Sequence, residues 1–309
     1  MTEKIAIIGA GLVGSGWAIV FARAGFEVAL FDSVGGAATA AREVIAARLS
    51  DLKAFGLVAN ERDVLGRVSV AADLRSTLED AIYAQESAYE QVEVKRELFS
   101  KIDAVIGPRT LIGSSSSGIP SSAFTEHVAC RDRVLIAHPV NPPYLAPIVE
   151  LVPAPWTRPD AVKAVRTLME GVGQSPVEMT REVEGFILNR LQAVLLMEAW
   201  RLVEAGLATV EDIDLTISRG LGLRWSFMGP FETIDLNAPG GVADYARRFG
   251  PLYQRIAASC SDQRLWSDDL IERVEQQRRK ILSADDLPKR SAWRDRKLME
   301  LARHRAEKC

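Results

Sequence analysis

A histidine and a glutamate are the first candidates for proton-transfer chemistry. His138 directly follows the apolar run Val134–Ala137, and Glu150 lies inside a second apolar run, Ile148–Val152. Because histidine titrates near neutral pH, at a strand end it can exchange a proton with a substrate hydroxyl. A carboxylate inside a strand is costly to bury without a partner. The turn-rich loop Pro139–Pro147 can bring the two runs side by side, so we expect Glu150 to fix the tautomer of His138; the alternative is an ordinary core histidine.

Four consecutive serines follow another apolar run. Ser114–Gly118 comes directly after Thr110–Gly113, which is a predicted strand. Hydroxyl groups at a strand end can donate hydrogen bonds to a ligand oxygen, although a helix-capping loop has the same composition. The run lacks the G-x-S-x-G elbow of serine hydrolases, which argues against that class of enzyme.

A glycine-rich turn joins the first predicted strand to the first predicted helix. Its residues are Gly9, Ala10, Gly11, Leu12, Val13 and Gly14. In a G-x-G-x-x-G motif the first glycine allows a tight turn, the second admits a pyrophosphate, and the third lets helix and strand pack closely. The free N–H groups of the helix N-terminus then face the phosphates. The motif therefore predicts a dinucleotide site.

Asp32 ends the second predicted strand, about 20 residues after the glycines, where dinucleotide-binding folds place a ribose-binding carboxylate. A carboxylate there repels a 2′-phosphate, and the next residues, Ser33 and Val34, include no arginine to pair with one. Both features favour NAD over NADP. The alternative is that the glycines form only a tight turn and that Asp32 caps the next helix.

Short apolar runs alternate with helical patterns through the first half of the chain, which predicts a mostly parallel sheet. The predicted strands are Lys4–Ile8, Glu27–Phe31, Arg67–Val70, Ala81–Gln85, Thr110–Gly113 and Val134–Ala137, with Ile148–Val152 as a further candidate. The predicted helices between them are Leu12–Ala24 and Ala37–Leu57.

The second half is helical in pattern. Phe186–Glu204 has apolar residues at helical spacing, and Gly206 stands where that helix would end. Further predicted helices are Val210–Ser218, Pro239–Phe249, Leu265–Leu282 and Ser291–Lys308. We therefore predict an α/β Rossmann-type NAD-binding domain over residues 1–183. An all-α domain for substrate binding and dimerisation follows over residues 184–309.

Composition narrows the class of protein. The chain has 309 residues, a net charge of −3 and 26% charged residues, so it lacks the basic character of a nucleic-acid-binding protein. Three widely spaced cysteines, Cys130, Cys260 and Cys309, predict neither a disulfide framework nor a metal site. The uncharged stretch Ile5–Ala22 is interrupted by glycines, which argues against a membrane span. We expect a cytoplasmic protein.

Taken together, these residues resemble the 3-hydroxyacyl-CoA dehydrogenase superfamily and, within it, the lambda-crystallin and L-gulonate 3-dehydrogenase group. The resemblance covers nearly the whole chain. The stretches that carry it are IIGAGLVGSGWA, QESAYEQVEVKRELF, AHPVNPPYLAPIVELVP, EGFILNRLQ, EAWRLVEAG, GLRWSFMGPFETIDLNA and WRDRKLMELA. The middle and C-terminal stretches are more specific than the glycine motif.

The resemblance implies a catalytic set. His138 matches the catalytic base in the H-x-x-N-P motif, and Glu150 matches the carboxylate that orients it. Ser117 and Asn189 match residues that hydrogen-bond the reacting oxygen and therefore also bind substrate. Without the resemblance, Asn189 would be interpreted as an ordinary helix N-cap.

The resemblance also adds residues to the NAD site. Glu90 and Lys95 match residues near the nicotinamide ribose, and Asn141 matches a residue beside the nicotinamide. From the residues alone, Lys95 would be interpreted as a surface lysine on a helix.

Two departures bear on the substrate. Gly118 stands where the hydroxyacyl-CoA enzymes tend to have a second hydroxyl residue. Arg224 and Trp225 match the gulonate and carnitine dehydrogenases rather than the fatty-acid enzymes. Asn189, which belongs to the gulonate-type motif, then favours a gulonate over a carnitine dehydrogenase. A guanidinium suits a carboxylate, so Arg224 is a candidate substrate anchor, with a surface or interhelical salt bridge as an equal alternative.

The expected function is NAD-dependent oxidation of the 3-hydroxyl of a small L-3-hydroxy acid, specifically L-gulonate to 3-dehydro-L-gulonate. One alternative is a short-chain L-3-hydroxyacyl-CoA dehydrogenase. Another is a non-catalytic NAD-binding structural protein. The resemblance also implies a homodimer.

Overall fold

The chain forms two compact units. The structure is a computed structural model, and it describes residues 3–260 and 264–306. Unit 1 comprises Met1–Arg190 and Ala292–Cys309, and unit 2 comprises Leu191–Ser291. Cys309 lies outside the described residues, whereas Cys130 is buried and Cys260 is half-buried.

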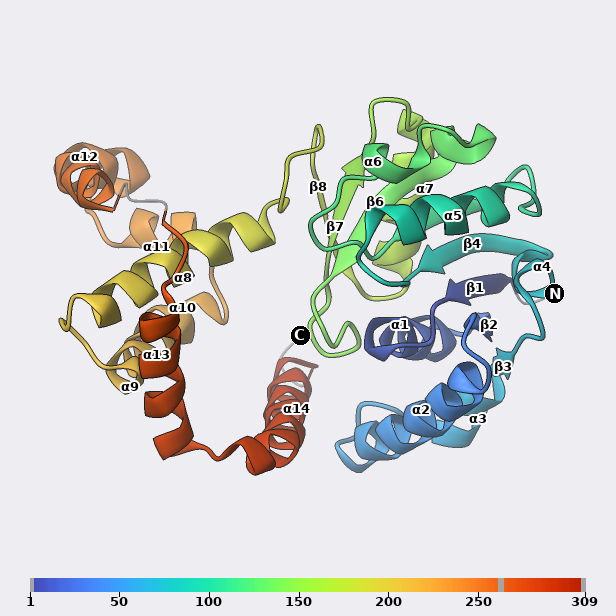
Figure 1. Cartoon of the computed structure of the whole chain (residues 1–309), viewed down its shortest axis with the longest axis horizontal. Helices are drawn as coiled ribbons and strands as arrows, with labels where there is room; N and C mark the ends of the chain where they lie inside the picture. The colour runs from blue at the N-terminus through green and yellow to red at the C-terminus, as the bar shows by residue number, and fades with distance from the viewer. Residues whose placement is uncertain (1–2, 261–263, 307–309) are drawn as a thin grey trace. The chain divides into compact units, whose positions relative to one another are not determined.

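Unit 1 is built on one sheet, which in the described residues has eight strands in the order β3-β2-β1-β4-β5-β6-β7-β8 (Figure 1). The strands are β1 (Lys4–Ile8), β2 (Glu27–Phe31), β3 (Val68–Val70), β4 (Ala81–Glu86), β5 (Leu111–Ser114), β6 (Val134–Pro139), β7 (Ile148–Pro153) and β8 (Ser175–Glu178). The pair β6–β7 is antiparallel and the other pairs are parallel, so the predicted mostly parallel sheet is confirmed.

Helices cover both faces of this sheet. They are α1 (Leu12–Arg23), α2 (Ala37–Ala54), α3 (Glu61–Gly66), α4 (Leu74–Leu78), α5 (Val92–Asp103), α6 (Ser122–Thr125), the 3-10 turn Ala129–Arg133 and α7 (Pro159–Gly171). In Figure 1, α1 and α2 lie on one side of the sheet and α5 and α6 on the other. A parallel sheet covered on both faces explains why the strands at its centre, such as β1 and β6, are almost continuously apolar.

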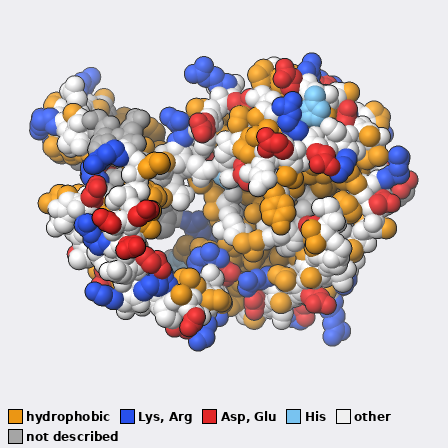
Figure 2. All heavy atoms as spheres, viewed as in Figure 1, with side chains coloured by type: hydrophobic (Ala, Val, Ile, Leu, Met, Phe, Trp, Pro, Cys, Tyr) orange, Lys and Arg blue, Asp and Glu red, His pale blue; other side chains and the backbone are white. Residues whose placement is uncertain are grey.

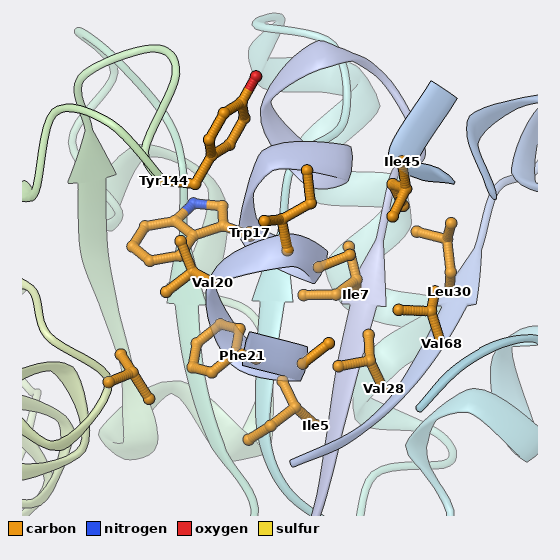
Figure 3. Packing of buried hydrophobic residues seen from close by; sticks show 14 of the residues in the cluster. Ile5, Ile7, Trp17, Val20, Phe21, Val28, Leu30, Ile45, Val68 and Tyr144 are labelled. Atoms are coloured by element: carbon orange, nitrogen blue, oxygen red, sulfur yellow. The ribbon is translucent and has the colours of Figure 1, made fainter. Parts of the chain in front are cut away.

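The alternation of side chains along β1 separates the apolar core of unit 1 into two clusters in its described part. Ile5 and Ile7 pack with residues of α1, α2 and α7, whereas Ala6 and Ile8 pack with Phe99 of α5. Figure 3 shows the first cluster, in which Trp17 and Phe21 of α1 lie against the strands. The rings of Trp17 and Phe21 stack with centroids 5.6 Å apart. This core holds the strand ends that carry the candidate site.

Unit 2 is helical, as predicted. Its elements are α8 (Leu188–Glu204, whose first three residues belong to unit 1), α9 (Val210–Thr216), the π-helical segment Ile217–Leu221, α10 (Gly222–Trp225), α11 (Pro230–Leu236), α12 (Gly241–Ser259), α13 (Asp268–Ile281), the 3-10 turn Ala284–Asp286 and the start of α14 (Leu287–Ala306). Gly206 ends α8 with φ +68°, a left-handed conformation that favours glycine. Among the described residues, no helix has both the length and the apolar character needed to cross a membrane.

The last helix returns to unit 1. Met299 of α14 is buried and joins the core cluster around α1 and α2, and Leu298 packs against the same cluster. Asp295 is buried and lies 3.7 Å from Arg48 of α2. This division differs from the predicted one, which assigned residues 184–309 to one helical domain. An amphipathic pattern shows that a helix has an apolar face, but not which surface that face covers.

Candidate active site

The glycine turn is shaped so that only glycine fits at two of its positions. Gly9 has φ +99°, and a Cβ there would lie 2.5 Å from the carbonyl oxygen of Ser87. A Cβ at Gly14 would lie 1.9 Å from the oxygen of Gly9. At Gly11, by contrast, a Cβ would meet nothing within 4 Å, so open space lies over the N-terminus of α1. This is the space that a diphosphate group requires.

Asp32 ties the end of β2 to that turn. Its Oδ2 accepts a hydrogen bond from the amide of Ala10 at 2.7 Å, and its Oδ1 accepts one from the amide of Val34 at 2.9 Å. Each carboxylate oxygen has a second lone pair, so the group can still accept ribose hydroxyls. A pocket of about 380 Å³ lies here, lined by Ile8, Gly9, Ala10, Gly11, Phe31, Asp32, Ser33, Val34, Ala37, Ser87, Ala88, Tyr89 and Leu98.

The pocket fits NAD. It combines the open space at Gly11, the free amides of a helix N-terminus and a carboxylate at the end of β2. No lysine or arginine is among its lining residues, so it offers no cation to a 2′-phosphate. The same features were the sequence basis for expecting NAD rather than NADP.

His138 and Glu150 form a buried pair on neighbouring strands. The two residues are directly opposite each other in the antiparallel β6–β7 register, and His138 Nδ1 lies 2.7 Å from Glu150 Oε2. Both side chains are buried. This is the contact expected from the two apolar runs and the loop between them.

Glu150 also holds the beginning of α8. Its Oε1 accepts hydrogen bonds from the amides of Ile187 at 2.8 Å and Leu188 at 2.9 Å. Burial alone would raise the pKa of Glu150, but the hydrogen bonds from His138, Leu188 and Ile187 outweigh it and hold the pKa below its usual range. A charged carboxylate only accepts hydrogen bonds, so His138 carries its proton on Nδ1 in the neutral state and leaves Nε2 as the basic nitrogen.

A left-handed turn directs those amides toward Glu150. Gly185 has φ +75°, and Phe186 has φ +51°, which is rare for a residue with a bulky side chain. The Phe186 ring is fully buried, and its centroid lies 5.8 Å from that of His138. Phe186 was predicted as the first residue of a helix rather than as a site residue, because one aromatic side chain at helical spacing gives no signal of this contact; the helix begins at Leu188 instead.

The serine loop, Ser114–Gly118, is organised around Glu90. Its Oε1 accepts hydrogen bonds from the hydroxyl of Ser116 at 2.6 Å and from the amides of Ser117 and Gly118 at 2.8 and 3.1 Å. Asn189 Nδ2 donates to the backbone oxygen of Ser117 at 2.5 Å. The loop is thereby joined to the first turn of α8, which Glu150 holds in turn. Four predicted residues, Ser117, His138, Glu150 and Asn189, therefore belong to one connected region.

Lys95 lies on α5 and is buried, whereas the residues alone had suggested a surface lysine on a helix. Its Nζ lies 2.9 and 3.0 Å from the two oxygens of Glu86 and 3.5 Å from Glu90 Oε2. Glu86 is fully buried and also accepts hydrogen bonds from Ser114 Oγ and the amide of Ala88. Glu86 was missed because the predicted strand ended one residue earlier, at Gln85, so the argument used for Glu150, a strand carboxylate that needs a partner, did not reach it.

Burial would raise the pKa of Glu90. The hydroxyl of Ser116, the charge of Lys95 and the amides of Gly118 and Ser117 more than offset burial, so the pKa of Glu90 lies below its usual range. The serine loop is therefore held by a charged carboxylate at neutral pH.

Two predicted residues have no partner in the part of the chain that the structure describes. Asn141 Oδ1 is buried and accepts no hydrogen bond from any described residue. Buried polar atoms normally have a partner, so this oxygen is available to accept a hydrogen bond from a ligand. Arg224 is exposed on α10 in unit 2, and its guanidinium forms no ion pair with any described residue. The interhelical salt bridge weighed for Arg224 is therefore not observed.

The chain matches both domains of one enzyme family. Residues 4–183 match the family described as 3-hydroxyacyl-CoA dehydrogenase, NAD binding domain, and residues 185–277 match its C-terminal domain. The chain belongs to the 3-hydroxyacyl-CoA dehydrogenase family. As a member of this family it is an NAD-dependent oxidoreductase that acts on hydroxyl groups.

Several relatives of this dehydrogenase span nearly its whole length. A lambda-crystallin homolog of Bos taurus is 41% identical over 96% of this chain and 94% of its own. An L-carnitine dehydrogenase of Streptomyces coelicolor is 39% identical over 85% of this chain and 84% of its own. A solved NAD⁺-dependent dismutase, 5-formyl-3-hydroxy-2-methylpyridine 4-carboxylic acid 5-dehydrogenase, has a TM-score of 0.85 and 28% identity, and the match covers 98% of both chains.

Proposed function

We propose that this dehydrogenase oxidises the 3-hydroxyl of a small L-3-hydroxy acid, with L-gulonate, which becomes 3-dehydro-L-gulonate, as the substrate. The observation that carries the proposal is the buried pair of His138 and Glu150, 2.7 Å apart, with Glu150 fixed by two backbone amides. The L-gulonate assignment rests on the motif resemblance described above. It is also supported by the lambda-crystallin homologs that align with nearly the whole chain.

His138 is the proposed general base. Its Nδ1–H donates to Glu150, so Nε2 is the nitrogen that accepts the proton of the substrate hydroxyl. When His138 becomes an imidazolium, the adjacent negative charge of Glu150 stabilises it. Bound NAD supplies the nicotinamide ring that accepts the hydride from the substrate carbon.

Ser117 and Asn189 are the proposed donors to the reacting oxygen. The backbone of Ser117 is fixed by Glu90 and by Asn189, while its side chain is exposed. The Ser117 hydroxyl is 3.4 Å from Glu90 Oε1, a long contact that leaves it free to turn toward a ligand. Donors held in advance stabilise developing charge on oxygen without reorganisation.

In the cofactor site, we propose that Gly9, Gly11, Leu12, Val13, Gly14 and Asp32 hold the adenosine and diphosphate parts of NAD. Glu90, Lys95 and Asn141 are proposed for the nicotinamide end. The unpartnered oxygen of Asn141 and the charged pair of Lys95 and Glu90 support this assignment.

A free carboxylic acid, rather than a CoA thioester, is the proposed substrate class. Arg224 is exposed and makes no ion pair with any described residue, so it can bind a carboxylate in two-pronged geometry. Relatives are named for small carboxylates, L-carnitine and a pyridine carboxylic acid. A further relative, from Gibberella moniliformis, is named a 3-hydroxyacyl-CoA dehydrogenase, which makes the short-chain thioester the second candidate.

A substrate panel separates these candidates. The purified protein is assayed with L-gulonate, L-3-hydroxybutyrate, L-carnitine and 3-hydroxybutyryl-CoA, each with NAD and NADP, by absorbance of the reduced cofactor. We expect the highest kcat/KM with L-gulonate and NAD. A preference for the CoA ester would replace the proposed substrate. NADH binding without oxidation of any hydroxy acid would favour a non-catalytic structural protein.

We also propose that the protein is a homodimer joined through unit 2. The described apolar core of this unit is small, with Val203, Val210 and Leu270 as its buried members. Large apolar side chains of the unit are exposed instead, among them Phe231 (78%) and Phe227 (71%). Figure 2 shows hydrophobic side chains at the surface of these helices. Because the helices have too little core of their own, a second copy of the unit is the occupant that completes it.

Sedimentation equilibrium tests the dimer. The unmodified protein should sediment at twice the mass of the chain, and Phe231→Glu should shift it toward the monomer. Val44→Glu, at a half-exposed apolar position on α2 of unit 1, is the control and should leave the mass unchanged. A monomeric unmodified protein would contradict this part of the proposal.

A further inference from the structure

A buried hydrogen-bond network lies under the cofactor pocket, outside the residues assigned above. Its members come from α1, from β4 and the residue after it, and from the serine loop. They are Trp17, Tyr83, Gln85, Ser87 and Ser115. Ser87 is the member that also lines the pocket.

One backbone carbonyl sets the direction of the inner part of this network. The carbonyl of Ala137 can only accept, and Gln85 Nε2 donates to it at 3.2 Å. The second hydrogen of that nitrogen goes to Ser115 Oγ at 2.7 Å. The amide oxygen of Gln85 therefore faces Tyr83, whose hydroxyl donates to it at 2.5 Å. Burial raises the pKa of Tyr83 well above its ordinary value, so this hydroxyl keeps its hydrogen.

The same reasoning fixes which hydrogen bonds Ser115 accepts and which one it donates. An indole N–H only donates, and Trp17 Nε1 donates to Ser115 Oγ at 3.2 Å. Ser115 Oγ thus accepts from both Gln85 and Trp17, which uses both of its lone pairs. Its single hydrogen is left for the remaining contact, Ser87 Oγ at 2.8 Å. Ser115 is the donor in that pair and Ser87 is the acceptor.

Ser87 consequently has a hydrogen to donate and no described residue to receive it. Its hydroxyl oxygen accepts from Ser115, and no other side-chain or backbone acceptor in residues 3–260 and 264–306 forms a hydrogen bond with it. The residue is half-buried at the wall of the pocket, directly across the turn from Gly9. We propose that Ser87 donates this hydrogen bond to an oxygen of the bound dinucleotide, with its hydroxyl oriented by the buried network.

The network is rigid enough to orient a donor. Trp17, Tyr83 and Gln85 are each 0% exposed. The Tyr83 hydroxyl occupies the space beside Gly113, where a Cβ would lie only 1.8 Å from it. Because Ser87 is held before the ligand arrives, little side-chain entropy is lost when its hydrogen bond forms.

Equilibrium binding tests the proposal without any turnover. NADH is titrated into the unmodified protein and into Ser87→Ala, with the change in NADH fluorescence as the readout. We expect the Kd of NADH to rise about 3- to 10-fold, the loss expected for one hydrogen bond. The control is Ser69→Ala on β3, whose hydroxyl donates to the carbonyl of Val28 away from the pocket lining, and it should bind NADH normally. A Kd unchanged in Ser87→Ala would overturn the proposal.

The role of the network is tested by a double-variant cycle. Ser115→Ala removes the donor that orients Ser87, so alone it should weaken NADH binding about 2- to 5-fold. In the Ser87→Ala background it should add no further loss. An equal loss in both backgrounds would show that Ser115 acts independently and would overturn the orientation argument. If Ser87→Ala does not fold, Ser87→Cys, a near-isosteric but weaker donor, replaces it with the same expected direction.

Discussion

Unit 1 and unit 2 differ in how far their apolar and charged side chains find partners within the same unit. The described part of unit 1 has two large apolar clusters, and its buried charged side chains are paired: Lys95 with Glu86, His138 with Glu150, and Asp295 with Arg48. Unit 2 has a small apolar cluster and many exposed large apolar side chains. The residues proposed to bind the cofactor and transfer the proton thus all lie in one unit. The unsatisfied groups of the other unit, Arg224 and the exposed aromatic side chains, are those proposed to meet substrate and a second copy.

This contrast separates two kinds of variant. Changes at His138 or Glu150 should affect the chemical step. Changes at Arg224 should affect substrate binding and leave the chemistry intact.

The largest effect is expected from His138→Asn. Asparagine can still hydrogen-bond Glu150 but cannot act as a base, so kcat should fall about 10²- to 10⁴-fold. The Kd of NADH should change little, because His138 is not among the residues that line the NAD pocket at the glycine turn. Steady-state kinetics and a fluorescence titration measure the two quantities. An unchanged kcat would remove His138 from the mechanism.

Glu150→Gln should have the next largest effect. It keeps the shape of the side chain but removes the charge that stabilises the imidazolium and fixes its tautomer, so kcat should fall about 10- to 100-fold. Glu182→Gln is the matched control. Glu182 lies in the segment that leads into α8 and ties it to the start of α6, since it accepts hydrogen bonds from Ser121 Oγ and the amide of Ser122; no hydrogen bond or ion pair joins it to His138 in the described residues. Equal losses in the two variants would mean that Glu150 acts only by holding the beginning of α8.

Arg224→Met should move KM rather than kcat. Loss of the carboxylate partner is expected to raise KM for a free hydroxy acid about 10-fold. Arg219→Met controls for the general loss of positive charge; Arg219 is an exposed arginine five positions before Arg224, in the π-helical segment Ile217–Leu221. If the two variants have the same KM, Arg224 is not the anchor.

The smallest effect is on stability at low pH. The pKa of Glu150 is below its ordinary value of 4.5, since the hydrogen bonds to the carboxylate outweigh burial. A lowered folded-state pKa stabilises the fold above the ordinary value, and that stabilisation is lost as pH falls through the folded-state pKa. Urea unfolding between pH 6 and about pH 3 should therefore show a smaller loss of stability in Glu150→Gln than in the unmodified protein. Parallel pH profiles would contradict the lowered pKa.

Local chemistry made much of unit 1 predictable from the sequence. The glycine turn, Asp32 and the run before His138 each have short-range signals, and the pairing of His138 with Glu150 followed from the cost of burying a lone carboxylate. Glu86 obeys the same rule and was missed, because the predicted strand ended at Gln85, whereas β4 extends to Glu86. The strand β8, Ser175–Glu178, has no apolar run and gave no signal of its own.

Long-range packing was not predictable in the same way. The pattern of α14 indicated an amphipathic helix, but only the structure places Leu298 and Met299 on the core of unit 1. The contacts of Trp17 and Gln85 with Ser115 join segments far apart in the sequence. Hydrogen-bond partners of this kind depend on the geometry of three elements at once, which no spacing in the sequence encodes.

The position of the deuterium label after one turnover tests the central claim most directly. L-Gulonate with deuterium at C3 is mixed with NAD and excess enzyme, and the reduced cofactor is analysed by mass spectrometry. Oxidation at the 3-hydroxyl predicts that the reduced cofactor gains one deuterium, whereas substrate labelled at another carbon gives unlabelled NADH. Unlabelled NADH from the C3-labelled substrate, or no reduction at all, would contradict the account.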